Sequence, residues 1–271
     1  MTSSPTSLPT DLEPRTQPET QRRAFVEQVM GLPMSLHVRG PGAPGPRVQA
    51  AAERAFARLR ADDVEFSTYR PDSAVSRIQR GELAIADASP RLREVAALCE
   101  QAADRTDGMF SAWLPGESGA SFDPTGLVKG WAVEDTFRRL VDELAALGPH
   151  DVLLSAGGDV VVTCERTDTP DWTVAVADPS DPRKVLRSIP LRVGAVATSE
   201  ITTRGLHVVD PRSGTPVDAL LSATVVGPSL LWADVFATAL LVSGGPAPWF
   251  DALRVDHAAL VVHRDGTVAV V

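Results

Sequence analysis

The feature that most constrains the fold is a change in sequence texture near residue 151. Before it, long stretches carry apolar residues at helical spacing, whereas from 151 to 226 short runs rich in Val and Leu alternate with Gly, Pro and Asp. Such alternation predicts several antiparallel strands joined by turns. Because helical and strand-rich stretches are segregated, the pattern predicts an α+β fold with a mixed, mostly antiparallel sheet and packed helices. It does not support a doubly wound parallel sheet.

Four helices are predicted from apolar periodicity and from the residues at their ends. After the turn-forming segment PGAPGP, Ala51, Ala55 and Leu59 fall on one face of the first helix. Gly148 and Pro149 are typical of a helix end and close the third. The predicted helices span about 47–60, 90–105, 126–147 and 229–242.

Strands are predicted on both sides of residue 151. The run VMGLPMSLHV predicts a strand over 29–38, and VEFSTY predicts another over 64–69. Near the C-terminus, Asp265 and Gly266 predict the turn of a hairpin. The strand-like runs between 151 and 226 are DVLLSA, DVVVTC, WTVAVA, LRVGAVATS, LHVVD and LSATVV.

The first 24 residues are rich in Pro, Thr, Ser and Glu and show no apolar period. Such a composition does not offset the entropy of ordering the chain, so residues 1–24 are expected to form a disordered tail and residues 25–271 one domain. The start shows no apolar stretch of a secretory signal, and no later stretch reaches the roughly 20 apolar residues of a membrane span. The protein is therefore expected to be cytoplasmic, without membrane insertion.

The charge balance argues against one class of partner. Asp and Glu outnumber Lys and Arg by 35 to 26, a formal net charge of −9, whereas nucleic acid and anionic membranes are bound by clustered basic residues. The two cysteines, Cys99 and Cys164, are too few for a disulfide framework or a cysteine-rich zinc site. Proteins and small molecules are the expected partners, with no nucleic acid.

The segment FDPTGLVKGWAVED, residues 122–135, combines a turn with a helix start. Its Asp-Pro-Thr-Gly turn leads directly into the predicted helix that carries Lys129. A helix N-terminus offers unpaired N–H groups to an anion, and Lys129 adds a point charge beside them. The combination suits a phosphate, although an ordinary helix cap with a solvated lysine has the same residues.

Two further clusters lie where strands are expected to end. In LLSAGGDVVV, two glycines permit close backbone approach and Asp159 can accept hydrogen bonds from amides. A plain hairpin turn explains that segment equally well, and it lacks the GxGxxG pattern of a Rossmann site. The segment 196–217 carries His207 and Asp210, which strand alternation puts on opposite faces. A strand histidine is more often structural than catalytic.

The predicted helix SLLWADVFATALLVSG is apolar almost all round, yet it contains Asp234 and Thr238. Four residues apart, these two oxygen-bearing side chains share one helix face and can reach one hard cation. A carboxylate in an apolar helix is costly unless it is paired or bound to a metal. A hydrogen bond to a neighbouring loop is the alternative.

Taken in this order, the four clusters resemble the ApbE family of FAD:protein FMN transferases over roughly residues 29–245. Seven ordered motifs are hard to obtain by chance, and on them the chain is identified as a member of that family. The matching segments are Met30-Gly31, FSTYRPDSAVSRI, Asp123-x-x-Gly126-x-x-Lys129-Gly130, Ala156-Gly157-Gly158-Asp159, Ala197-Thr198-Ser199, His207-x-x-Asp210-Pro211-x-x-Gly214 and Ala233-Asp234-x-x-Ala237-Thr238.

The resemblance implies a T-fold-like α+β domain that binds FAD in a cleft, with Mg²⁺ at the diphosphate. Carried over by position, the magnesium ligands are Asp234, Thr238 and the backbone carbonyl of Gly126. The FAD contacts carried over in the same way are Met30, Tyr69, Phe110, Asp123, Lys129 and Val208.

The resemblance also implies a reaction. The hydroxyl of a Thr or Ser in an acceptor protein attacks the phosphorus on the flavin side of FAD, giving phosphoester-linked FMN and AMP. His207 is the candidate general base because the ordinary pKa of histidine lies near the operating range, with Asp234 as the alternative. Family acceptors carry a short Asp-x-x-Thr-like motif. The sequence identifies neither the acceptor nor the oligomeric state.

Three positions depart from the family pattern. Leu32 stands in place of Thr, Ser111 in place of Asp, and Glu200 in place of Gly, where it adds bulk and negative charge near the expected diphosphate. Two other functions stay open. One is hydrolysis of FAD to FMN and AMP with water as the nucleophile, which no residue excludes. The other is flavin binding without catalysis, for which Glu200 is the only hint.

Overall fold

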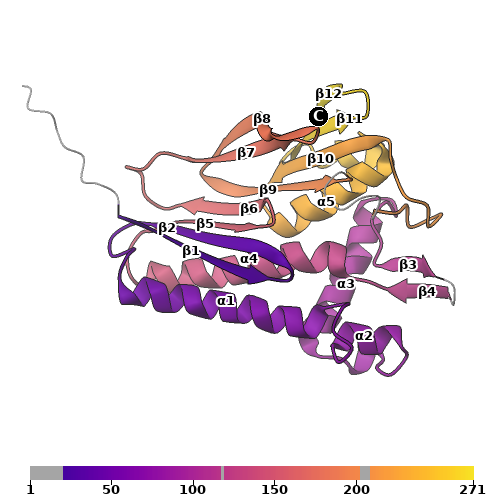
Figure 1. Ribbon diagram of the computed structural model, residues 1–271, viewed down its shortest axis with the longest axis horizontal. Coiled ribbons are helices and arrows are strands. Elements are labelled where there is room, and N and C mark those ends of the chain that lie inside the picture. The colour runs from indigo at the N-terminus through magenta and orange to yellow at the C-terminus, as the bar shows by residue number, and fades with distance from the viewer. Residues whose placement is uncertain (1–20, 117–118, 202–207) are drawn as a thin grey trace, which may run out of the picture.

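The computed structural model describes residues 21–116, 119–201 and 208–271 (Figure 1). The first 20 residues of the predicted tail lie outside the described residues, but its last four residues, 21–24, are described. Strand β1 begins at Arg22 and pairs with β2 along its whole length, so residues 22–24 belong to the sheet.

The main sheet of the described residues has eight strands, and every neighbouring pair is antiparallel. Two separate hairpins, β3–β4 and β7–β8, add to it. The α+β prediction is confirmed. In spatial order the sheet contains β1 (Arg22–Val29), β2 (Leu32–Arg39), β5 (Asp151–Ala156), β6 (Asp159–Cys164), β9 (Val193–Glu200), β10 (Leu220–Gly227), β11 (Ala258–His263) and β12 (Val268–Val270). The hairpins are β3 (Trp113–Gly116) with β4 (Gly119–Phe122) and β7 (Trp172–Asp178) with β8 (Asp181–Leu191).

Long helices lie against one face of the main sheet, with α1 and α4 side by side and α5 next to β9 and β10 (Figure 1). The prediction of α3 over 90–105 is confirmed to the residue, since Ser89 caps it by accepting a hydrogen bond from the Leu92 amide. The helices are α1 (Pro46–Phe66), α2 (Ala74–Gln79), α3 (Pro90–Arg105), α4 (Thr125–Ala145), α5 (Leu230–Ser243) and α6 (Pro248–Asp251), with a short 3-10 helix at Ile85–Asp87.

Two predicted strands are wrong in instructive ways. The run 64–69 is not a strand, because α1 continues to Phe66, whose buried ring meets Trp131 edge-on at 5.3 Å. The run 29–38 is broken after its first residue by a two-residue turn, in which Met30 and Gly31 have φ of 54° and 70°. Two successive positive φ angles match the right-handed twist of a hairpin.

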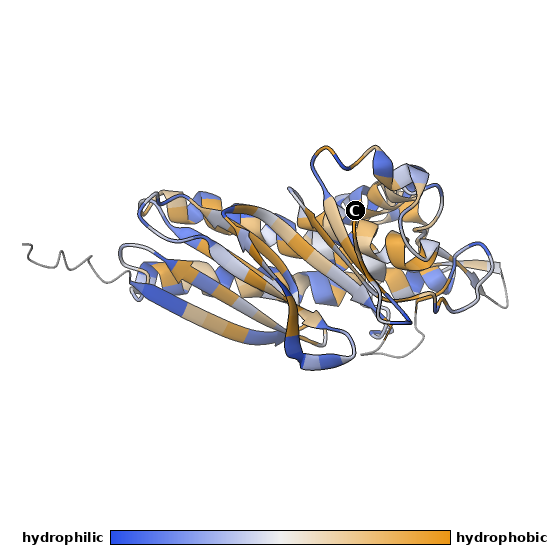
Figure 2. Cartoon of the chain, turned by 90° about the horizontal axis from the view of Figure 1, so that it is seen from above, coloured by the Kyte–Doolittle hydropathy of each residue, from blue (hydrophilic) through white to orange (hydrophobic). Residues whose placement is uncertain are grey.

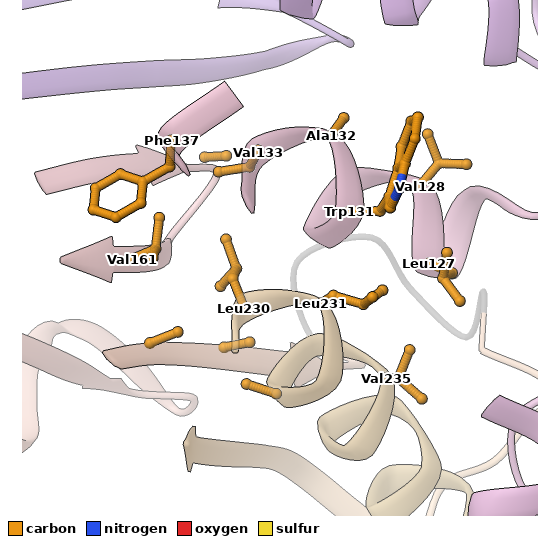
Figure 3. Packing of buried hydrophobic residues seen from close by; sticks show 14 of the residues in the cluster. Leu127, Val128, Trp131, Ala132, Val133, Phe137, Val161, Leu230, Leu231 and Val235 are labelled. Atoms are coloured by element: carbon orange, nitrogen blue, oxygen red, sulfur yellow. The ribbon is translucent and has the colours of Figure 1, made fainter. Parts of the chain in front are cut away.

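The core that positions the site lies between α4 and α5. Helix α5 is buried on nearly all sides, and its apolar side chains meet those of α4 (Figure 3). The strands of the main sheet carry bands of hydrophobic and hydrophilic residues (Figure 2), and a smaller apolar cluster packs β7 against β6 and β9. Among the described residues, no helix has the length and apolarity needed to cross a membrane.

Candidate active site

The start of α4 is organised by Asp123. Its Oδ1 accepts hydrogen bonds from the Thr125 amide at 3.0 Å and from the Thr125 hydroxyl at 2.6 Å. Its own amide donates to the Ala112 carbonyl at 2.7 Å. Thr125 and Gly126 in the first turn of the helix are exposed, but the Leu127 and Val128 amides already donate to the Pro124 carbonyl. The Asp-Pro-Thr-Gly segment therefore forms the predicted helix start, whereas its use as an anion site stays a prediction.

One turn further along α4, Lys129 lies between two acids from other elements. Its Nζ donates to Asp159 Oδ2 and lies 3.3 Å from Asp234 Oδ1. The Asp159 and Asp234 side chains are only 3% and 4% exposed, whereas the Lys129 side chain is 25% exposed. We call these three residues the lysine cluster. It joins α4, β6 and α5 around a cation that still reaches solvent.

Asp159 was not among the predicted site residues, although it stands in the Gly-Gly-Asp segment. Its second oxygen, Oδ1, accepts a hydrogen bond from the Thr198 amide at 2.9 Å. One carboxylate thus connects Lys129 to the end of β9. The sequence signal was an acid directly after two glycines, but its partner lies 30 residues away on a helix.

Burial and Lys129 act in opposite directions on the pKa of Asp234. Burial raises the pKa of Asp234, against the charge and hydrogen bond of Lys129 and a contribution from the Gly130 backbone N–H, which lower it. Its Oδ2 is buried and has no hydrogen-bond partner in the part of the chain that the structure describes. Gly130 permits this close contact between helices, since a Cβ there would lie 3.1 Å from Leu231 Cα and 3.2 Å from Asp234 Oδ2.

Thr238 lies one turn after Asp234 and joins a set of hydroxyl groups. Its Oγ1 is 2.8 Å from Ser199 Oγ, and Thr198 Oγ1 is 2.9 Å from Thr224 Oγ1. Thr238 thus contacts β9, whereas Asp234, one turn earlier on α5, contacts Lys129 of α4. Ser199, Thr198 and Thr224 were not predicted as site side chains.

The predicted magnesium ligands are all oxygen atoms. No group of three His, Cys, Asp or Glu side chains comes together as a metal site in the part of the chain that the structure describes. Magnesium, however, is usually held by one or two carboxylates, completed by water and substrate phosphates. Asp234 Oδ2, buried and unpartnered among the described residues and one helical turn before the Thr238 hydroxyl, fits such an ion.

The other predicted contacts are more scattered. Met30 is half-buried in the β1–β2 turn, and Phe110 is buried with its ring against Gly126, where a Cβ would lie 3.1 Å away. Val208 is half-buried and its carbonyl accepts a hydrogen bond from the Val217 amide at 3.1 Å. Tyr69 is 95% exposed. The predicted general base, His207, lies outside the described residues.

The three departures have local roles. Leu32 begins β2 and packs on Gly157, where a Cβ would lie 3.1 Å from Leu32 Cδ2. The Ser111 hydroxyl bonds both backbone groups of Trp113. Glu200 closes β9 opposite Ser222 of β10. Leu32, which follows the Met30-Gly31 turn, thus covers the turn that contains Gly157.

Lysine is a rare residue in this chain. The chain contains 24 arginines but only two lysines, Lys129 and Lys184. An ammonium is a compact point charge that can exchange partners, whereas a guanidinium is a rigid planar fork. At this position between two buried acids, an otherwise arginine-rich chain carries the compact cation.

Residues 30–115 and 112–260 match the family model described as the ApbE family. The chain belongs to the ApbE family. A Rhodobacter capsulatus protein named FAD:protein FMN transferase is 35% identical over 136 residues, which are 46% of this chain and 26% of that relative. An Escherichia coli protein of the same name is 25% identical over 281 residues, covering 83% of this chain and 77% of the relative. The chain thus spans about a quarter of the first relative and most of the second.

Solved structures share the fold. The ApbE protein of Thermotoga maritima superposes with a TM-score of 0.77 at 20% identity, covering 92% of this chain and 96% of that chain. The apo flavinyl transferase ApbE of Pseudomonas stutzeri gives a TM-score of 0.74 at 24% identity, covering 93% and 94%. At these identities the likeness establishes the ApbE fold for this chain.

Proposed function

We propose that this protein transfers the FMN half of FAD to a Thr or Ser hydroxyl of an acceptor protein and releases AMP. The observation that carries the proposal is the lysine cluster, one turn after the start of α4. Lys129 supplies a partly exposed cation near the positive end of the helix dipole, and together they suit a diphosphate. Relatives named FAD:protein FMN transferase support the choice of substrate.

In the proposed reaction the acceptor hydroxyl oxygen forms a bond to the phosphorus on the flavin side of FAD. The bond from that phosphorus to the bridging oxygen breaks, and AMP leaves with the bridging oxygen. Lys129 and the first turn of α4 would offset the charge on the phosphate oxygens throughout. Their effect is largest if they are already in place before the reaction, as the fixed α4 start provides.

Asp234, Thr238 and the Gly126 carbonyl are the proposed holders of Mg²⁺. The partnerless Asp234 Oδ2 and the nearby Thr238 hydroxyl support that assignment. Bound there, the ion would supply further stabilisation of charge on the diphosphate oxygens. Asp159 would keep Lys129 oriented when Asp234 turns to the ion.

The proton of the acceptor hydroxyl needs a base. His207 stays the prediction for that role, and Asp234 is the second choice because burial, by raising its pKa, makes it a stronger base than an exposed carboxylate. Met30, Phe110 and Val208 stay predicted flavin contacts. Exposed Tyr69 can serve FAD only from the surface side. A cytoplasmic location likewise stays a prediction.

The test is to incubate the full chain with FAD, MgCl₂ and an acceptor domain that contains an Asp-x-x-Thr motif. Intact mass of the acceptor and release of AMP are recorded together. Asp234→Asn is the site variant, and Asp62→Asn, which alters another buried Asp, is the matched control. The proposal expects one FMN unit per acceptor and one AMP, both lost in Asp234→Asn and kept in Asp62→Asn.

Two outcomes would overturn the proposal. Release of AMP and free FMN with unlabelled acceptor, also with a set of alternative Thr-containing domains, would assign FAD hydrolysis instead. Binding of FAD with neither product would assign a flavin-binding protein without catalysis.

A further inference from the structure

The lysine cluster depends on how two helices are placed against each other. Lys129 belongs to α4 and Asp234 to α5, and their charged atoms lie 3.3 Å apart. A slide of α5 by a fraction of a turn would separate them. The contacts that fix α5 along α4 therefore decide whether the cluster forms.

Glu134 makes such a contact. Its Oε2 accepts hydrogen bonds from the Ser229 hydroxyl at 2.7 Å and from the Leu231 amide at 2.9 Å. Leu231 lies in the first turn of α5, where amides have no partner within the helix, and a carboxylate there is also favoured by the helix dipole. Glu134 thus binds α5 at its first turn by charge-assisted bonds.

This contact lies close to the lysine cluster. Glu134 follows Lys129 by five residues on α4, about 7.5 Å along the axis, and Leu231 precedes Asp234 by three residues on α5, about 4.5 Å. From the Lys129–Asp234 contact to the Glu134–Leu231 contact, residue numbers rise along α4 and fall along α5, so the two helices are antiparallel. The two contacts hold this pair of helices at two points. Between them, Gly130 allows the backbones to meet.

We propose that Glu134 is a positioning residue of this site: by binding the first turn of α5, it holds Asp234 against Lys129. The effect of Glu134 on catalysis rests on the proposed function. The effect of Glu134 on the placement of Lys129 does not depend on that function. The alternative is that Glu134 only adds stability, as any helix cap does.

The chain contains a matched control. Ser229 and Ser89 are both helix N-caps that accept from the amide three residues on and donate to a glutamate of another helix. Ser229 donates to Glu134 of α4, and Ser89 donates to Glu65 of α1. Loss of either serine hydroxyl removes one cap bond and one bond to a glutamate, but only Ser229 lies at the start of α5.

The two lysines supply a readout that does not need activity. Lys129 is 25% exposed and paired with two acids, whereas Lys184 is 70% exposed on β8. Brief acetylation of the full chain with acetic anhydride, followed by peptide mass spectrometry, gives the ratio of modified Lys129 to modified Lys184. Lys184 corrects each sample for reagent dose.

The proposal expects Glu134→Ala to raise this ratio severalfold. Glu134→Gln, whose amide oxygen can still accept both bonds, is expected to restore most of the wild-type ratio. Ser229→Ala is expected to raise the ratio, but less than Glu134→Ala does. Ser89→Ala is expected to lower the melting temperature as much as Ser229→Ala does and to leave the ratio unchanged. If Glu134→Ala does not fold, the comparison of Ser229→Ala with Ser89→Ala decides.

A ratio that stays at the wild-type value in folded Glu134→Ala, or that rises equally in Ser229→Ala and Ser89→Ala, would overturn the proposal. Flavin transfer is measured on the same samples well below their melting temperatures. It is expected to lose about tenfold in kcat in Glu134→Ala, because the paired groups are displaced, and to recover in Glu134→Gln. If the wild-type chain transfers no flavin, the proposed function fails while the acetylation result still tests the placement of Lys129.

Discussion

Helix α4 contributes a residue to each of two ionic clusters that look alike in chemistry. The first is the lysine cluster. The second is an arginine cluster, Arg91 of α3 with Asp62 of α1 and Asp135 of α4. In each, a partly exposed cation bridges two acids from different elements, and in each one buried carboxylate oxygen has no hydrogen-bond partner. An oxygen without a partner is therefore not enough to mark a site.

The surroundings of the cations separate the two clusters. Arg91 lies over the Trp131 ring at 4.7 Å, so its plane is fixed by stacking as well as by the Asp62 bond. Among the described residues, Lys129 stacks on no aromatic ring, and it lies one turn after the start of α4. Stacking thus fixes the plane of the guanidinium, whereas the compact ammonium lacks that constraint, and under the proposed function we expect only the ammonium to contact the substrate.

The largest expected effect is on the lysine cluster. Asp234→Asn should lower flavin transfer by about 100-fold or more, since it removes the proposed metal ligand and an electrostatic partner of Lys129. Its melting temperature should not fall, because burial of the charged carboxylate is unfavourable. Acceptor mass and differential scanning fluorimetry check both parts. Flavin transfer by Asp234→Asn at the wild-type rate would contradict a functional role for the lysine cluster.

Lys129→Arg asks whether the type of cation matters. A guanidinium can keep the charge but not the compact geometry, so transfer should fall by about tenfold. The matched exchange, Arg91→Lys, should leave transfer unchanged. Steady-state rates at saturating FAD measure both. Equal effects of the two exchanges would contradict the assignment of one cluster to function and the other to structure.

Arg91→Ala should act on stability alone. It leaves Asp62, which is fully buried, without its cation, but Arg91 is 36% exposed and solvent screens the pair. The expected loss is about 1–2 kcal/mol, a fall in melting temperature of roughly 2–8 °C, with the transfer rate of the folded protein kept. A lowered rate well below the melting temperature would show that the arginine cluster also serves the site.

The smallest expected effect is a pH dependence at Asp62. Burial raises the pKa of Asp62 above its usual value, although Arg91 opposes the shift. The folded state therefore binds this proton more tightly than the unfolded state, so the contribution is favourable at low pH and is lost as pH rises through the folded pKa. Asp62→Asn should flatten the stability curve from about pH 4 upward, as measured by urea unfolding. If stability falls more steeply with pH in Asp62→Asn than in the wild type, the effect of Arg91 on the pKa of Asp62 outweighs that of burial.

Some of the site was readable from sequence because its signals are local. The helical period puts Asp234 and Thr238 on one face, and in the structure Thr238 meets Ser199 of β9 while Asp234 meets Lys129 of α4. The Asp-Pro-Thr-Gly segment forms a helix start as predicted. The run 64–69 failed because its β-branched and aromatic residues also suit the last turn of a helix that buries Phe66.

The sequence by itself determined the α+β class, most helix ends and the family, because caps, turns and periodicity act over a few residues. The tertiary structure decided that Lys129 meets Asp159 and Asp234, that Asp234 is buried, and that Glu134 binds the first turn of α5. Asp234 is far from Lys129 along the chain, so their contact depends on how α5 lies against α4. That placement comes from apolar packing and close approach at Gly130, which no local pattern records.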